Sequence, residues 1–148
     1  MERPKRILVD ADACPVKEII LRMAKRRNIP VTMVIDTSHE LDDGYSTIIT
    51  VDKGSDSADY FIAGMATRHD VVVTQDYGLA AMVLARGASA IDQNGMVYTG
   101  DNIDGLLERR YIGQKIRRGG GRTKGPKKRS REDDERFENA FGKMLDWK

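Results

Sequence analysis

The chain has 148 residues, 40% of them hydrophobic, and a formal net charge of +2. This length suits one domain with a sizeable core and a short appendage, and it excludes two large domains. With a single cysteine, Cys14, and two histidines, the chain cannot form an intramolecular disulfide or a cysteine-rich zinc site, so a metal site would need mainly oxygen ligands.

Five short, β-branched apolar segments predict strands that are buried on both faces. They span residues 6–9, 31–35, 47–51, 70–74 and 88–91. Between most of them, apolar residues recur at helical spacing, over residues 15–27, 57–68 and 77–86. Pro15 suits a first helical turn, and Gly87 suits a helix end. The alternation predicts an α/β fold of three αβα layers around a mostly parallel sheet.

Carboxylates follow three of the predicted strands. They are Asp10 and Asp12 after the first strand, Asp52, Asp56 and Asp59 after the third, and Asp76 after the fourth. Open parallel sheets place their chemistry at the carboxyl ends of the strands, so we expect these side chains to share one edge. Such a cluster would favour a hard divalent cation, Mg²⁺ or Mn²⁺. For any single aspartate, a helix cap is an equally good interpretation.

Three further polar residues lie beside these carboxylates in the sequence. Cys14 could be a nucleophile at a helix N-terminus, although a packed small residue is the favoured interpretation. Lys17 and Lys53 could contact a phosphate group, and a plain surface lysine is an equally good interpretation of each.

Charge divides the chain into three parts. Residues 1–112 carry thirteen Lys/Arg and seventeen Asp/Glu, whereas residues 113–131 carry nine basic residues and no acidic one. We therefore expect an α/β body over 1–112, a basic glycine-rich ribbon over 113–131, and a C-terminal helix over 132–148. The ribbon's glycines disfavour a regular helix, and basic blocks of this kind often contact nucleic acid. Its candidate phosphate-binding residues are Arg117, Arg118, Arg122, Lys124, Lys127 and Lys128.

The predicted C-terminal helix is amphipathic. Phe137, Phe141, Met144 and Leu145 recur at helical spacing, and acidic residues in its first turn complement the helix dipole. We expect this helix to dock on the body or on a second copy of the chain in a homodimer. Docking on the body would draw the ribbon across the surface, towards the carboxylates.

Four stretches carry a resemblance to a known family. DADACPVK (10–17), KGSDSADYFIA (53–63), VVVTQDYGLA (71–80) and GGRTKGPKK (120–128) resemble the bacterial YaiI/YqxD family, also called UPF0178 or DUF188. The resemblance covers nearly the whole chain. The family is in turn distantly similar to PIN-like nucleases, which implies a PIN-like fold and a metal-dependent nuclease activity.

The nuclease resemblance implies a set of site residues. Asp10, Asp59 and Asp76 would be the catalytic metal ligands, and Asp12 and Asp56 would be additional ligands. Thr74 matches a small hydroxyl residue often found before the later acid, and Ser55 and Lys17 would be supporting polar residues. Many PIN domains carry a further acid shortly after this position, where the present chain has Gly78 and Leu79. Asp12 or Asp56 would then have to complete the site.

The leading hypothesis is a nuclease that uses Mg²⁺ or Mn²⁺ and acts on nucleic acid, RNA in preference to DNA. One alternative is a nucleic-acid-binding module whose site no longer cleaves. Another is a phosphatase of the haloacid dehalogenase class, with Asp10 as nucleophile and Asp12 as acid and base.

No segment has the roughly 18 to 20 consecutive apolar residues that span a bilayer, so we expect a cytoplasmic protein without membrane contact.

Overall fold

The computed structural model describes residues 3–36, 41–54, 57–118 and 128–146, and only the backbone of residues 110–118. Five residues with a predicted role lie outside these ranges, as do the side chains of Arg117 and Arg118; they are Ser55, Asp56, Arg122, Lys124 and Lys127. In chain order the elements are β1 (Arg6–Asp10), α1 (Lys17–Arg27), β2 (Val31–Asp36), β3 (Thr47–Val51), α2 (Ser57–Met65), β4 (Asp70–Val73), α3 (Tyr77–Ala85), β5 (Ser89–Ile91), β6 (Val97–Tyr98), α4 (Gly100–Arg118) and α5 (Arg131–Leu145).

The strands form one six-stranded sheet in the order β3-β2-β1-β4-β5-β6. The first five strands are parallel, and β6 joins the edge antiparallel to β5. β1 lies between β2 and β4, so the direction of strand addition reverses between β1 and β4. The predicted mostly parallel α/β architecture is confirmed.

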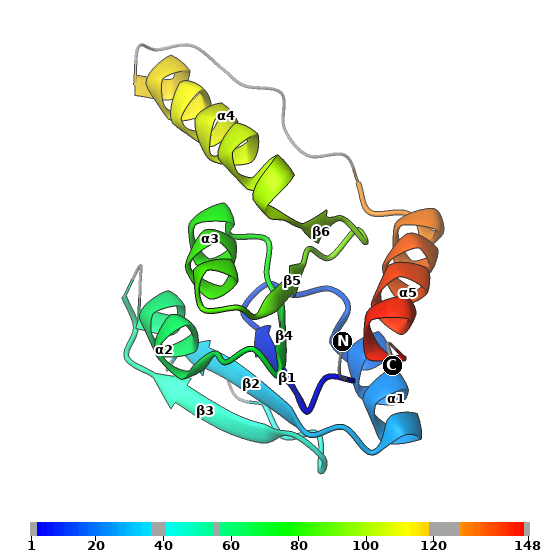
Figure 1. Ribbon diagram of the computed structural model, residues 1–148. Helices are drawn as coiled ribbons and strands as arrows, with labels where there is room; N and C mark the ends of the chain where they lie inside the picture. Colours follow the sequence, from blue (N-terminus) through cyan, green and yellow to red (C-terminus); the bar gives the residue numbers. More distant parts are fainter. Residues whose placement is uncertain (1–2, 37–40, 55–56, 119–127, 147–148) are drawn as a thin grey trace.

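Helices cover both faces of the sheet, as Figure 1 shows. Because side chains alternate along a strand, Ile7 and Val9 enter one core and Leu8 enters the other. The first core includes residues of α1 and α5, and the second includes residues of α2, α3 and α4. The predicted three layers are therefore confirmed.

The C-terminal helix α5 docks on the body and lies beside α1. Phe137, Phe141 and Leu145 are completely buried, and the two phenylalanine rings stack with their centroids 5.0 Å apart. Ser130 begins the helix with a capping box, in which it exchanges hydrogen bonds with Asp133. Where a helix was predicted over 132–148, the structure has α5 with bounds of Arg131–Leu145.

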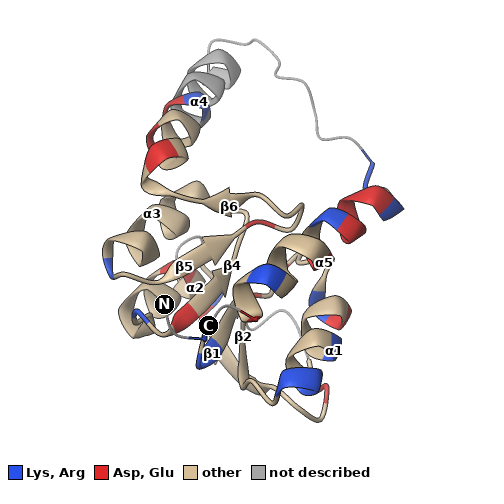
Figure 2. Ribbon diagram, turned by 45° about the vertical axis from the view of Figure 1, so that its right-hand side comes forward, with Lys and Arg blue, Asp and Glu red and all other residues tan. Residues whose placement is uncertain are grey.

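Charged residues of both signs occur along α1 and α5, which lie side by side (Figure 2). Arg22 pairs with Glu138 at 2.8 Å, and Arg27 pairs with Asp146 at 2.6 Å. These pairs are exposed, so each adds little to stability beyond the burial of the apolar side chains beneath them.

Two elements differ from the sequence-based prediction. The short strand β6 was not predicted, because two residues are too few to show an alternation of apolar and polar side chains. The helix α4 runs through the predicted boundary at residue 112 and includes residues 113–118, which were expected to belong to an irregular ribbon. Because Gly119–Gly121 come after these residues, the first part of the ribbon carries no glycine after Gly113 and can continue the helix.

Smaller differences concern helix ends. α1 begins at Lys17 and not at Pro15, and α2 ends at Met65, three residues before the predicted end. Gly87 follows α3 with φ of +86°, as expected for a residue after a helix end.

Among the described residues, no helix combines the length and the apolar character needed to cross a membrane.

Candidate functional site

The candidate site lies where the strand order reverses. β1 and β4 pair in parallel, and Asp10 is the last residue of β1 while Thr74 follows the end of β4. In open α/β sheets, the carboxyl ends of two strands at such a reversal form a crevice in which ligands bind. Asp10 and Thr74 therefore occupy the position in this fold that is best suited to hold a ligand.

A chain of hydrogen bonds joins the ends of the two strands. Thr74 Oγ1 donates to Asp10 Oδ2 at 3.0 Å and accepts from the backbone N–H of Asp76 at 3.0 Å. The Thr74 carbonyl accepts from the hydroxyl of Tyr98 at 3.1 Å. Thr74 is only 3% exposed, so these contacts fix its hydroxyl group and, through it, one oxygen of Asp10.

The environment of Asp10 disfavours its charged form. Burial is the main cause that raises the pKa of its carboxyl group, the charges of Asp76 and Asp12 raise it further, and the hydrogen bond from Thr74 opposes the shift. Within the described residues, no ion pair neutralises Asp10. An added cation would relieve this repulsion, because it would favour the ionised form of all three carboxylates.

Asp70 is the first residue of β4 and so lies at the opposite end of the strands from Asp10. It shows how this fold neutralises a structural carboxylate. Arg6 donates to Asp70 Oδ1 at 3.0 Å and to Oδ2 at 2.8 Å, which is a two-point ion pair. Asp70 is 3% exposed. The contrast distinguishes Asp10 from a buried aspartate that only supports the fold.

Asp12 and Asp76 have additional structural roles. Asp12 Oδ2 accepts a hydrogen bond from the backbone N–H of Asp36 at 3.0 Å, which ties the loop after β1 to the end of β2. Asp76 caps α3, because its Oδ1 accepts from the N–H groups of Gly78 at 2.8 Å and Leu79 at 3.2 Å. The capping interpretation therefore holds for Asp76, and its charge also acts on Asp10.

The loop between β1 and α1 is strained beside this site. Ala13 has φ of +56°, a region that residues with a side chain rarely adopt. Next to it, burial is the main cause that raises the pKa of the Cys14 thiol. A thiol that resists ionisation supports the interpretation of Cys14 as a packed residue. Lys17 Nζ donates to the carbonyl of Ala11 at 3.4 Å, so this lysine lies over the same loop.

The expected convergence of carboxylates is present only in part. The loop after β1 and the segment after β4 come together, whereas Asp59 lies in the first turn of α2. Among the described residues, no three Asp, Glu, His or Cys side chains are placed so that they could jointly hold a metal ion. The assignment of Asp59 and Asp56 as metal ligands remains a prediction.

Three residues beside Asp10 had no role in the sequence-based prediction. Gln75 and Gln93 line a small hollow of about 10 Å³ together with Asp10, Cys14, Val73 and Thr74, which is room for about one water molecule or small ion. Arg129 donates to the Gln93 carbonyl at 2.7 Å and to Asn94 Oδ1 at 2.8 Å. Gln75 could have been noticed from its place between Thr74 and Asp76, but nothing in the sequence connects Arg129 with Gln93.

Arg129 also fixes the end of the predicted basic ribbon. Its side chain bonds to Asp134 at 2.7 Å in the first turn of α5, and Lys128 beside it is exposed. The ribbon therefore leads into a residue that is bound to the wall of the candidate site. The course of the ribbon between α4 and Lys128 lies outside the described residues, so its approach to the carboxylates remains a prediction.

Comparisons with known proteins find one family. A family model described as an uncharacterised YaiI/YqxD family, DUF188, matches residues 8–146. A UPF0178 protein of Ruminiclostridium cellulolyticum is 62% identical over 135 residues, which cover 91% of this chain and 88% of the relative. A UPF0178 protein of Clostridium acetobutylicum is 50% identical over 142 residues, 95% of this chain and 96% of the relative. No solved structure matches the chain significantly.

Proposed function

The chain belongs to the YaiI/YqxD family, and we propose that it is a divalent-metal-dependent phosphodiesterase that acts on nucleic acid. The observation that carries this proposal is the position and environment of Asp10. It stands at the reversal of strand order, is held by Thr74, and has a pKa raised by burial and by the charges of Asp76 and Asp12.

The chemistry of the donor groups fits Mg²⁺ or Mn²⁺. The hollow offers oxygen donors from Asp10, Thr74 and two glutamines, and hard divalent ions prefer such donors. Mg²⁺ is usually bound by one or two carboxylates together with waters and substrate phosphates, so the absence of a three-residue group among the described residues is compatible with this ion. Asp10 would hold it, with Asp76 or Asp12 as the second carboxylate.

When bound, such an ion would lower the pKa of a coordinated water and offset the negative charge of a phosphodiester. The residues of the chain would orient the partners. Thr74 fixes one oxygen of Asp10, and the cap of α3 fixes Asp76. Lys17, whose ammonium group donates to the carbonyl of Ala11 in the loop after β1, would approach a phosphate oxygen.

The case for nucleic acid rests on the basic residues that precede and include Arg129 in the sequence. Residues 113–131 carry nine Lys and Arg and no acidic residue, and Arg129 brings the end of this segment to the wall of the hollow. Contacts with phosphates by several cations release counterions, so binding should weaken steeply with added salt. RNA in preference to DNA remains a prediction, as do the cytoplasmic location, a homodimer and the similarity to PIN-like nucleases.

The test compares the wild type with Asp10→Asn and with Asp104→Asn, a matched change of an exposed carboxylate on α4. Mg²⁺ and Mn²⁺ are titrated by calorimetry, and cleavage of labelled RNA and DNA strands is followed with each ion. We expect Asp10→Asn to lose both ion binding and cleavage, while Asp104→Asn retains them. Cleavage by Asp10→Asn at the wild-type rate would contradict the proposal.

A nucleic-acid-binding module without catalysis is the second candidate. It is favoured by the structural roles of Asp76 and Asp12, which cap α3 and tie the loop to β2. In this case the wild type would bind nucleic acid but show no heat of ion binding and no cleavage. Capture of a phosphorylated Asp10 would instead select the phosphatase alternative.

A further inference from the structure

The outer edge of the strand β3 is open. β3 stands first in the sheet order, and no strand lies beyond it within the described residues. On its inner side it pairs with β2 along its whole length, from Thr47 to Val51. The backbone N–H and C=O groups on its other side form a row that can receive an additional strand.

This edge has none of the features by which proteins prevent the addition of a strand. Charged side chains, prolines, bulges and very short strands usually protect an edge. The segment TIITV (47–51) contains no charged residue and no proline, and its register with β2 contains no bulge. All five of its residues are at least partly exposed. β3 is therefore a regular, uncharged strand that is available for pairing.

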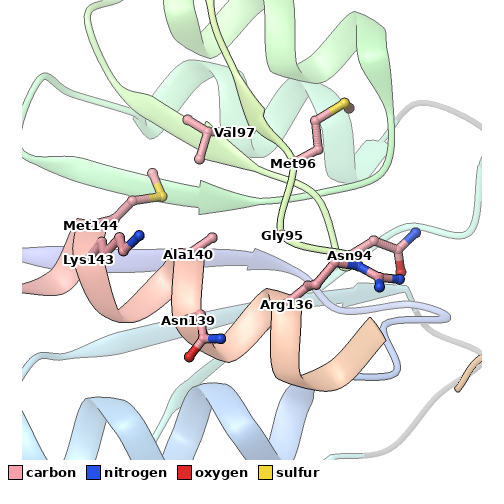
Figure 3. A pocket seen from close by; sticks show the side chains of 9 residues that line it. All are labelled: Asn94, Gly95, Met96, Val97, Arg136, Asn139, Ala140, Lys143 and Met144. Atoms are coloured by element: carbon pink, nitrogen blue, oxygen red, sulfur yellow. The ribbon is translucent and has the colours of Figure 1, made fainter. Parts of the chain in front are cut away.

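The opposite edge of the sheet is protected. The strand β6 at that edge has only two residues. The hairpin 92–96, which connects β5 and β6, lies against α5, as Figure 3 shows. The two meet at Gly95, where an added Cβ would lie 2.5 Å from the carbonyl oxygen of Arg136. A partner strand would therefore find a full-length edge only at β3.

Exposed aromatic side chains lie on the helix next to the open edge. α2 packs on the sheet over β1, β2 and β3, and Figure 1 shows it beside β3. On this helix Tyr60 is 68% exposed and Phe61 is 38% exposed, and they are the two most exposed large hydrophobic side chains of the described residues. Exposed aromatic residues are typical of protein interfaces. The open strand and the aromatic pair thus indicate one contact surface.

We propose that β3 pairs antiparallel with β3 of a second copy of this chain about a twofold axis, so that two sheets join into one. The register that pairs both strands completely places Ile49 opposite its own copy, Ile48 opposite Thr50, and Thr47 opposite Val51. The twofold axis that relates two neighbouring antiparallel strands is perpendicular to the sheet, so both α2 helices lie on the same side of the joined sheet. The aromatic residues of the two helices would then add to the contact between the strands.

A second copy fits this edge because the strand is complementary to itself. Every pair in the register joins two uncharged side chains, and directly opposed β-branched residues stabilise neighbouring strands. Extended by two residues, the register places the exposed Lys53 opposite Tyr45 and diagonally beside Asp43, which has the opposite charge. Asp52 falls opposite the neutral Ser46. No like charges face each other, which favours a second copy over an unrelated strand.

The test measures the oligomeric state of the full chain. Analytical ultracentrifugation follows the wild type, Thr50→Lys, Tyr60→Ser and Val97→Lys over a range of protein concentrations. Thr50 is exposed, so Thr50→Lys adds a charge to the edge without removing a core side chain. Val97→Lys is the matched control, because it adds the same charge to the opposite edge strand and to the groove beside α5. Thermal melting checks that each variant folds, and Tyr60→Ser decides if Thr50→Lys does not.

A second measurement tests the register. Ile49→Cys places a thiol opposite its own copy, at a separation that a disulfide between the two chains can span. Oxidised glutathione serves as the oxidant, and electrophoresis without reductant detects the linked chains. Val97→Cys is the control, and the wild type contributes only the buried Cys14.

We expect the wild type to form a dimer that Thr50→Lys and Tyr60→Ser each weaken by about tenfold or more and that Val97→Lys leaves unchanged. Ile49→Cys should become linked, and Val97→Cys should not. A monomeric wild type, a dimer that Thr50→Lys leaves intact, or a dimer that Val97→Lys dissociates would overturn the inference. So would a dimer whose Ile49→Cys variant is not linked, because the two strands would then not pair in this register.

Discussion

Arg129 Nη2 donates a hydrogen bond across 2.7 Å to the carbonyl oxygen of Gln93, a residue that precedes it by 36 positions. This bond joins the start of α5 to the hairpin that forms one wall of the Asp10 hollow. The candidate site is thus built from both ends of the chain, since Asp10 belongs to β1 and Arg129 directly precedes the capping box of the final helix.

Replacing Arg129 should loosen this connection. Arg129→Met loses the bonds to Gln93, Asn94 and Asp134, and we expect it to lower the free energy of unfolding by about 1 to 3 kcal/mol. Urea denaturation of wild type and variant measures the change. Arg131→Met, which alters a 93% exposed side chain, is the control and should change stability little. Equal stability of both variants would show that the Arg129 contacts contribute nothing.

Thr74 should position Asp10 through its hydroxyl group alone. Thr74→Val removes the donor to Asp10 and the acceptor for Asp76 N–H, so we expect a loss of about 1 to 3 kcal/mol in stability. Because this hydrogen bond lowers the pKa of Asp10, its loss should raise that pKa further, which carboxyl NMR titration can follow. Thr74→Ser keeps the hydroxyl and should restore the wild-type pKa. A Ser variant that behaves like Val would argue against this positioning role.

The raised pKa of Asp10 makes a prediction about pH. The folded protein binds the Asp10 proton more tightly than the unfolded chain, so ionisation of this group lowers stability as the pH rises from the unfolded pKa through the folded one. Asp10→Asn removes this penalty. It should therefore melt at a higher temperature than the wild type at pH 7, with a smaller difference at pH 3.

Divalent ions should offset the destabilising charge of Asp10 in the folded protein. We expect Mg²⁺ or Mn²⁺ to raise the melting temperature of the wild type at pH 7 and to leave Asp10→Asn unchanged, because only the wild type gains a ligand. If Asp10→Asn were less stable than the wild type at both pH values, the assignment of an unfavourable charge at this position would be wrong.

Gly95 should be essential to the contact between the hairpin and α5. Its φ is +89°, and an added Cβ would meet backbone atoms of Arg136 and Phe137 at 2.5 to 3.0 Å. Gly95→Ala should therefore cost more than the ~1 kcal/mol of an ordinary αL penalty. Gly105→Ala on α4, where nothing lies within 4 Å, should instead stabilise by about 0.5 to 1 kcal/mol. Chemical denaturation compares the two, and similar effects would contradict the close approach.

The sequence was sufficient for the five parallel strands and for the carboxylates that follow them, although Thr47–Val51 is a partly exposed edge strand and not, as predicted, buried on both faces. Short, continuous β-branched runs such as VTMVI favour buried strands over helices, and Asp10 follows such a run directly. The order of the strands could not be derived, because runs such as VVV and IIT pair equally well with any neighbour. The reversal between β1 and β4 therefore became visible only in the structure.

Other parts of the site left no signal in the sequence. Arg129 bonds to the backbone carbonyl of residue 93, which any residue type would offer. The amino-acid sequence therefore gives no indication of this contact. The last turns of α4 were missed because their basic residues resemble the glycine-rich segment that follows them, and its earlier part, residues 100–112, was not predicted as a helix either. Asp12 and Asp76 combine a charge near Asp10 with hydrogen bonds to backbone N–H groups, and spacing alone cannot separate these two roles.

The burial of Phe137, Phe141 and Leu145 against the sheet has a consequence for biosynthesis. One of the two cores lacks these side chains until residue 145 has emerged from the ribosome, although β1 to β5 are already available by residue 91. Folding of this chain is therefore completed after translation of its final helix. Until that moment the nascent chain exposes an apolar sheet face that chaperones can bind, and Arg129 has not yet reached the wall of the site.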